Sequence, residues 1–196
     1  MGAKKALADV YIGKFSYTQP AQPANPYQRP QGTMSTFVRL NGEKEVYAVD
    51  GYLSMTFNRS ITDYRDSKVL QVQKDKIQQI SVTNPGGNYT LTHNNDLWMI
   101  DGLQTDSASV AKFISGLTYL RSTNYKNDDA QPVFSPNFNM QIQGENGVLL
   151  ANIDGYYTDS TNITITSSSN PGTYFDGTKT ALFNKLFKNK SEFLKQ

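Results

Sequence analysis

The 196-residue sequence contains no cysteine and a single histidine, His93. The lack of cysteine excludes disulfides, thiolate catalysis, iron–sulfur clusters and cysteine-based zinc sites. With one histidine, the paired imidazoles of a typical transition-metal site are missing as well. We therefore expect no metal and no cofactor.

Long apolar runs and a strong charge of one sign are also lacking. No segment approaches the roughly 20 consecutive apolar residues of a membrane span, and residues 1–5 are not followed by the apolar stretch of a signal peptide. The net charge is +2 with 18% charged residues, which provides no broad electrostatic surface for nucleic acid. We expect a soluble chain that binds no nucleic acid and meets a membrane only through an anchor absent from this sequence.

What the sequence does contain is a recurrent Asp-Gly dipeptide, each time after a β-prone run. The four copies lie at 50–51, 101–102, 154–155 and 176–177. Aspartate bonds the following backbone and glycine tolerates positive φ, so each predicted strand should stop at a tight turn. Three copies lead into helix-like sequence. The expected fold class is therefore α+β, with repeated antiparallel hairpin or meander units each backed by a helix.

A second pattern suggests an internal duplication. Phe57-Asn58 follows the first Asp-Gly pair at the same spacing as Phe183-Asn184 follows the last. We treat the duplication as a hypothesis about structure.

Changes in composition divide the chain into four expected segments. Residues 1–70 form a β-rich N-terminal lobe that begins in the middle of a sheet, as if cut from a longer chain, and contains a proline-rich loop at 18–33. Residues 71–126 form a three-stranded meander plus a helix, and residues 127–137 form a linker between two lobes. Residues 138–196 form a C-terminal β-β-α lobe.

Local signals predict three further elements. Asp106 should cap a helix, because apolar residues recur on one face over the next 14 positions. Asn41-Gly42 is typical of a tight hairpin turn. Thr178 or Thr180 should cap the last helix, whose lysines would face outward.

A search for catalytic constellations favours a protein that is not an enzyme. His93 lies between two predicted strands, where we expect a solvated hairpin tip, and no nucleophile or orienting acid lies nearby in the sequence. The four Asp-Gly carboxylates could serve a glycoside hydrolase, but their turn context accounts for them without catalysis. A hydrolase that uses them remains the least favoured alternative.

Binding is the more promising class of function. Aromatic residues make up 12% of the chain, and tyrosine beside asparagine and glutamine is typical of glycan- or peptide-binding grooves. The proline-rich loop would lose little entropy on docking. We name Tyr27 and Arg29, at its far end, as candidate partner-binding residues, and keep a glycan- or peptide-binding domain as an alternative.

Two stretches, Tyr11–Tyr17 and Met34–Asn58, resemble a bacterial family known as domain of unknown function 4340. Leu97–Gly102 followed by Asp106–Phe113 is similar to that family's strand-then-helix element. The resemblance runs from about residue 11 to residue 194.

The resemblance implies a cellular location but no chemical reaction. Members are typically longer, with an N-terminal membrane anchor and an earlier β-rich module, which implies that this chain is the C-terminal portion of an envelope protein on the extracytoplasmic side. Some members are encoded beside gliding-motility-type ABC transporter components, which implies a protein partner there. The family has no established activity and no catalytic motif to transfer. We expect an uncharacterised, non-enzymatic binding or scaffolding module.

Overall fold

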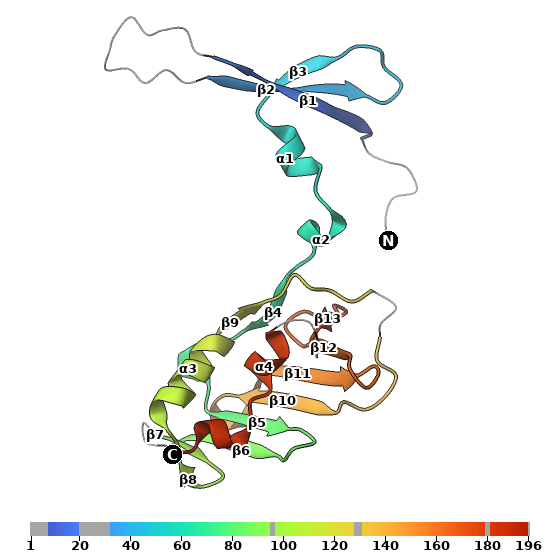
Figure 1. Ribbon diagram of the computed structural model, residues 1–196. Helices are drawn as coiled ribbons and strands as arrows, with labels where there is room; N and C mark the ends of the chain where they lie inside the picture. Colours follow the sequence, from blue (N-terminus) through green and yellow to red (C-terminus); the bar gives the residue numbers. More distant parts are fainter. Residues whose placement is uncertain (1–7, 20–31, 95–96, 128–130, 179–180, 196) are drawn as a thin grey trace, which may run out of the picture. The chain divides into compact units, whose positions relative to one another are not determined.

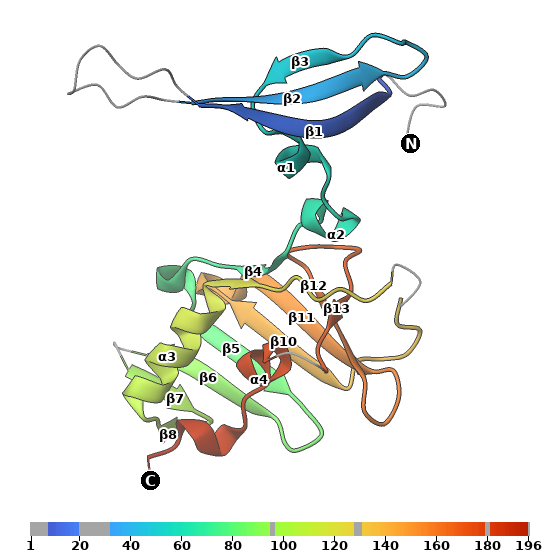
Figure 2. The same cartoon turned by 45° about the horizontal axis from the view of Figure 1, so that its top comes forward.

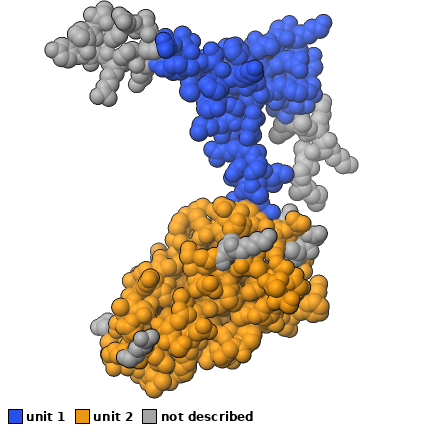
Figure 3. Space-filling model, in the orientation of Figure 1, with its two compact units in different colours: residues 1–65 blue, residues 66–196 orange. Residues whose placement is uncertain are grey.

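A computed structural model describes five stretches of the chain, residues 8–19, 32–94, 97–127, 131–178 and 181–195. The chain divides into two compact units, residues 1–65 (unit 1) and residues 66–196 (unit 2), which Figure 3 colours separately. Antiparallel strands predominate and a few helices accompany them, so the predicted α+β class is confirmed.

Unit 1 is a three-stranded antiparallel sheet followed by two short helices. Strand β2 (Thr33–Leu40) lies between β1 (Val10–Thr18) and β3 (Tyr47–Asp50), as Figures 1 and 2 show. Helices α1 (Leu53–Phe57) and α2 (Ile61–Tyr64) come next. They are separate because Ser60 begins a new helix, its side chain and that of Asp63 forming a capping box.

The β2–β3 connection is longer than the two-residue turn that its sequence suggests. Gly42 has a φ of 86°, as expected for a turn glycine, but six residues, 41–46, separate the two strands. The predicted hairpin is therefore present, with a wider loop.

Unit 2 is built on an eight-stranded antiparallel sheet and a two-stranded ribbon. The ribbon pairs β4 (Lys68–Gln71) with β9 (Tyr119–Arg121). The large sheet has the order β13 (Phe175–Asp176), β12 (Ile163–Ser167), β11 (Leu149–Tyr157), β10 (Phe138–Gln143), β5 (Gln79–Thr83), β6 (Tyr89–Asn94), β7 (Leu97–Ile100) and β8 (Leu103–Gln104).

Helices cover one face of this sheet. Figure 2 shows α3 (Ser107–Leu117) and α4 (Leu182–Leu186) on the same side of it. The Asp106 carboxylate accepts a hydrogen bond from the Ser109 amide at 3.0 Å, so the predicted cap of α3 is confirmed. Three short 3-10 helices complete the unit: η1 (Lys74–Lys76), η2 (Glu145–Gly147) and η3 (Lys190–Phe193).

The large sheet joins segments that the sequence assigns to different lobes. Strands β5 and β10 pair antiparallel along five residue pairs, with Ile80 opposite Ile142 and Val82 opposite Met140. These side chains share one apolar face, which is buried continuously across the junction. Residues 127–137 therefore connect two parts of unit 2, which differs from the expected linker between lobes.

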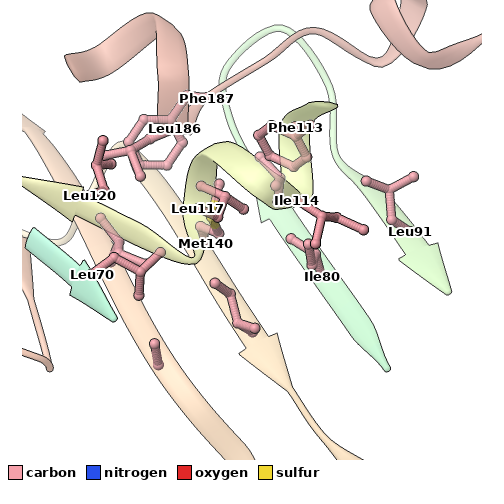
Figure 4. Close-up of a cluster of buried hydrophobic side chains, with 14 of the residues drawn as sticks. Leu70, Ile80, Leu91, Phe113, Ile114, Leu117, Leu120, Met140, Leu186 and Phe187 are labelled. Atoms are coloured by element: carbon pink, nitrogen blue, oxygen red, sulfur yellow. The ribbon is translucent and has the colours of Figure 1, made fainter. Parts of the chain in front are cut away.

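The core of unit 2 lies between this sheet face and the helices. Figure 4 shows side chains from α3, α4, the ribbon and the sheet meeting in one cluster. The predicted inner face of α3 is confirmed, because its four buried residues are Val110, Phe113, Ile114 and Leu117. Phe193 of η3 also belongs to the core, with its ring centroid 5.0 Å from that of Phe113.

The predicted turn at Asp154-Gly155 is wrong, because both residues lie inside β11. Gly155 serves packing instead. A Cβ built on it would lie 3.1 Å from the Phe138 Cβ and 3.3 Å from an edge carbon of Phe187. Because Gly155 has no side chain, Phe138 on the neighbouring strand can pack close to the β11 backbone.

The expected caps of the last helix are not observed. Thr178 does not cap α4; its hydroxyl accepts a hydrogen bond from the Ile163 amide at 2.6 Å, and the residue before α4 is Ala181. Thr180 lies outside the described residues.

Candidate functional site

The sheet of unit 1 has one apolar face and one face of mixed polarity. Residues directly opposite in an antiparallel pair share a face, and Phe15 is opposite Thr36, which is opposite Val49. The alternation therefore places almost only apolar residues on this side: Val10, Ile12, Phe15, Tyr17, Met34, Val38, Leu40, Tyr47 and Val49, around Thr36. We call these ten residues the unit 1 apolar face.

Helix α1 packs on this same face but covers little of it. The Thr36 hydroxyl donates to the Gly51 carbonyl at 2.6 Å and accepts from the Leu53 amide at 3.0 Å. The Phe15 ring lies 4.4 Å from the Tyr52 ring, centroid to centroid. Among the described residues of unit 1, Thr36 alone is fully buried.

The remaining apolar side chains of this face are open to solvent. Seven of them are between 37% and 54% exposed: Val10, Phe15, Tyr17, Met34, Leu40, Tyr47 and Val49. The corresponding residues of unit 2 under α3 and α4, such as Ile80, Met140 and Ile153, are 0% exposed. A contiguous apolar patch of this kind is characteristic of an interaction surface.

The opposite face of the unit 1 sheet is mixed. It carries Ser16, Ser35 and Arg39, whose guanidinium lies 4.8 Å from the centroid of the Tyr11 ring. Phe37 lies on this face as well and is 43% exposed, so the apolar side chains there are fewer and are interspersed with polar ones.

Unit 2 contains a separate cleft of about 600 Å³ beside α3, α4 and η3. Its floor includes Phe113, Leu120 and Phe193, which are nearly inaccessible, and its rim carries Lys112 and Lys185. The ammonium groups of these two lysines make no hydrogen bond or ion pair with another described residue. The accessible lining of the cleft is more apolar than polar, and its rim is cationic.

The other ionisable groups near this cleft are engaged with one another. The Lys188 ammonium lies 2.6 Å from a Glu192 carboxylate oxygen. Burial acts to raise the pKa of Glu192, but the hydrogen bonds from Lys188 and from the Asn189 amide outweigh it, so this pKa is lowered. Burial, together with the Glu192 charge, raises the pKa of Tyr89, whose hydroxyl donates to the Lys188 carbonyl. These contacts are structural.

Three of the four Asp-Gly carboxylates are each held by separate partners. Asp154 accepts from the Asn139 side chain at 2.6 Å, and Asp176 lies 3.7 Å from the Lys126 ammonium. Asp101 accepts from Lys190, and this hydrogen bond is the main cause that lowers its pKa. Asp50 ends β3 in unit 1. Within the described stretches, none of them lines the cleft beside α3.

His93 is not at a hairpin tip, as the sequence suggests, but within β6. Its ring stacks on Trp98 of β7, with centroids 4.9 Å apart and planes 24° apart. The imidazole thus has a packing partner on the neighbouring strand. Tyr27 and Arg29, the candidate partner-binding residues, lie outside the described residues.

A family model described as domain of unknown function (DUF4340) matches residues 28–135, more than half of the chain. The chain belongs to this family. No curated protein and no solved structure matches the DUF4340 chain. No helix in the described part of it combines the length and the hydrophobicity that crossing a bilayer requires.

The unit 1 apolar face was not identified from the sequence of the DUF4340 chain as a site, although its signal was present. Alternation in β1 and β2 predicts an apolar side, which normally implies a covering helix. The helix that follows Asp50-Gly51 ends at Phe57, after five residues, whereas α3 has eleven. Comparing the width of a predicted face with the length of the helix available to cover it would have located the surface.

Proposed function

We propose that this chain is a non-enzymatic docking module of the bacterial cell envelope, and that its docking surface is the unit 1 apolar face. The observation that carries this proposal is the contrast between seven open apolar side chains on this face and the fully buried residues of the same kind in unit 2. An exposed patch of this extent favours a protein partner over a small ligand, because it extends over all three strands of a sheet face.

The family resemblance directs the choice of partner. It implies an extracytoplasmic location and a neighbourhood of ABC transporter components, so subunits of a gliding-motility-type transporter are the first partners to test. The glycan- or peptide-binding alternative would need exposed tyrosines in a groove. The unit 2 cleft has one exposed tyrosine, Tyr119, at its rim, which supports that alternative less well.

We also propose that the chain is built from repeated units, each an antiparallel meander, an Asp-Gly pair and a helix. Asp50 ends β3 and Gly51 follows it before α1, and Asp176 ends β13 and Gly177 follows it before α4. On this reading α1 is a shortened counterpart of the covering helices of unit 2, which is why its sheet keeps an open apolar face.

Site-specific photo-crosslinking in the native cells tests the docking proposal. A photoreactive phenylalanine analogue in place of Tyr17, on the unit 1 apolar face, should form adducts with a defined envelope protein. Tyr119 is a matched control, because it is a tyrosine in unit 2 with the same 54% exposure. Equal adducts at both positions, or none at Tyr17, would refute the proposal.

Mass spectrometry of the adducts then tests the identity of the partner. Transporter subunits at Tyr17 alone would support the accessory role. Adducts with other envelope proteins would support the docking function but exclude transporter subunits as the partner.

A further inference from the structure

We propose that the partner at unit 1 docks by adding an antiparallel β-strand to the free edge of β1, with apolar side chains on the unit 1 apolar face and a carboxylate opposite Lys14. This inference rests on the proposed docking function and specifies the chemistry of the partner. The occupant is an extended segment of another polypeptide.

Among the described residues, β1 forms an unpaired edge of the unit 1 sheet. β2 is paired on both sides, whereas β1 is paired on one side only among the described residues. β1 is nine residues long, which is long for an edge strand, and its outer amide and carbonyl groups form a ready template for another strand. Strand addition supplies affinity through these backbone bonds and specificity through alternate side chains.

In unit 2 the same type of edge is covered by another meander. The large sheet of unit 2 consists of two four-stranded meanders, β5–β6–β7–β8 and β10–β11–β12–β13, joined antiparallel through β5 and β10, the first strand of each. Strand β1 is likewise the first strand of its meander. The pairing of β5 with β10 brings Ile80 against Ile142 and makes one wide apolar face. A strand on β1 would widen the unit 1 apolar face in the same way.

The charge of Lys14 disfavours pairing of β1 with the β1 of a second copy. A bulge between Ile12 and Phe15 places Gly13 and Lys14 together opposite Phe37, near the middle of β1. The Lys14 ammonium makes no hydrogen bond or ion pair with another described residue. Two copies paired about Lys14 would bring like charges face to face, which is unfavourable, whereas a carboxylate on the incoming strand would be favourable.

A peptide with the sequence Val-Thr-Val-Glu-Val-Thr-Val is the probe, since its valines share one face and its glutamate lies on the other. Its twin has lysine in place of the glutamate. We expect the glutamate peptide to bind the full chain about two- to fivefold more tightly than the lysine peptide, the size of a cross-strand charge pair. It should also slow amide exchange in residues 10–18.

Reversing the charge on the protein should reverse the preference. Lys14→Glu should bind the lysine peptide more tightly than the glutamate peptide. Lys44→Glu is the matched control, because it makes the same change of charge in the β2–β3 loop, and it should keep the original preference. A peptide N-methylated on the amides of its pairing edge should not bind, since the backbone donors are removed.

Three outcomes would overturn the inference. A chain that forms dimers by itself, with protected β1 amides, would mean that a second copy occupies the edge. A second outcome combines adducts at Tyr17 in cells with two negative results: the probe does not protect the β1 amides, and Lys14→Glu does not reverse the peptide preference. This outcome would leave docking intact and refute strand addition. Absence of both adducts and peptide binding would refute docking as well.

Discussion

The Lys190 ammonium lies 2.6 Å from a carboxylate oxygen of Asp101, although 89 residues separate them. The other Asp101 oxygen accepts a hydrogen bond from the Thr90 amide at 2.9 Å, and Asp101 itself has a φ of 47°. One side chain thus connects the turn after β7 to helix η3.

Replacing Asp101 tests the strength of this connection. Asp101→Asn keeps an acceptor for Thr90 and tolerates positive φ, so it should lose only the charge pair, less than about 1 kcal/mol. Asp101→Val should cost about 1–2 kcal/mol more, because a β-branched residue is strained there. Urea unfolding should show the Asp101→Asn deficit shrinking in 1 M salt, and a deficit independent of salt would contradict the prediction.

Gly155 and Gly116 make a matched pair of glycine tests. Gly155→Ala places a Cβ 3.1 Å from the Phe138 Cβ and should destabilise unit 2 by about 1–3 kcal/mol. Gly116→Ala lies in α3 with no atom within 4 Å of the added Cβ and should stabilise by about 0.5–1 kcal/mol. Both are measured by denaturant unfolding, and equal effects would contradict the packing argument.

Unit 1 should open far more readily than unit 2. Its described part has one fully buried residue, Thr36, whereas unit 2 contains the entire buried apolar cluster. We expect amides of β1 and β2 to exchange within the dead time of a manual experiment while those of β5 and β10 stay protected. Unfolding followed separately in each unit should give two transitions, and a single coincident transition would contradict this expectation.

Asp159 provides a test of pH dependence. Hydrogen bonds from the Asn162 side chain and then from the Thr161 amide lower the pKa of Asp159 to about 2. Since the folded pKa is below the usual value near 3.9, this turn is fully stabilised above pH 4 and loses that stabilisation as the pH falls through about 2.

An NMR titration measures this directly. The Thr161 and Asn162 amide shifts should move with a midpoint near 2 and should be flat over the same range in Asp159→Asn. A midpoint near 4 would show that the turn does not hold the carboxylate.

Local elements could be predicted from the sequence, because their signals are local. Helix α3 is an example: the Asp106 cap and the spacing from Val110 to Leu117 both act within a few residues. The meander strands β5 and β6 follow from alternation, and β7 follows from the short apolar run Leu97–Ile100.

Pairing between strands that are far apart in the sequence could not be predicted from such local signals. Nothing near Gln79 or Gln143 states that β5 and β10 lie side by side, and this pairing decides that residues 127–137 connect parts of one sheet. The role of Gly155 likewise depends on Phe138, which arrives from the neighbouring strand.

The candidate site could be predicted only in part. Alternation in β1 and β2 indicates which side chains share a face, but whether another element covers that face depends on the length of α1 and on its break before Ser60. The residues chosen from the sequence, Tyr27 and Arg29, stay a prediction.

The junction between β5 and β10 has a kinetic consequence. Gln79 and Gln143 pair at a sequence separation of 64, so the large sheet has a high contact order and closes only after a costly loop closure. During synthesis the first meander and α3 emerge before β10 has been made. The β5 edge therefore stays unpaired during that interval. Nascent unit 2 therefore passes through a stage at which β5 is vulnerable to aggregation.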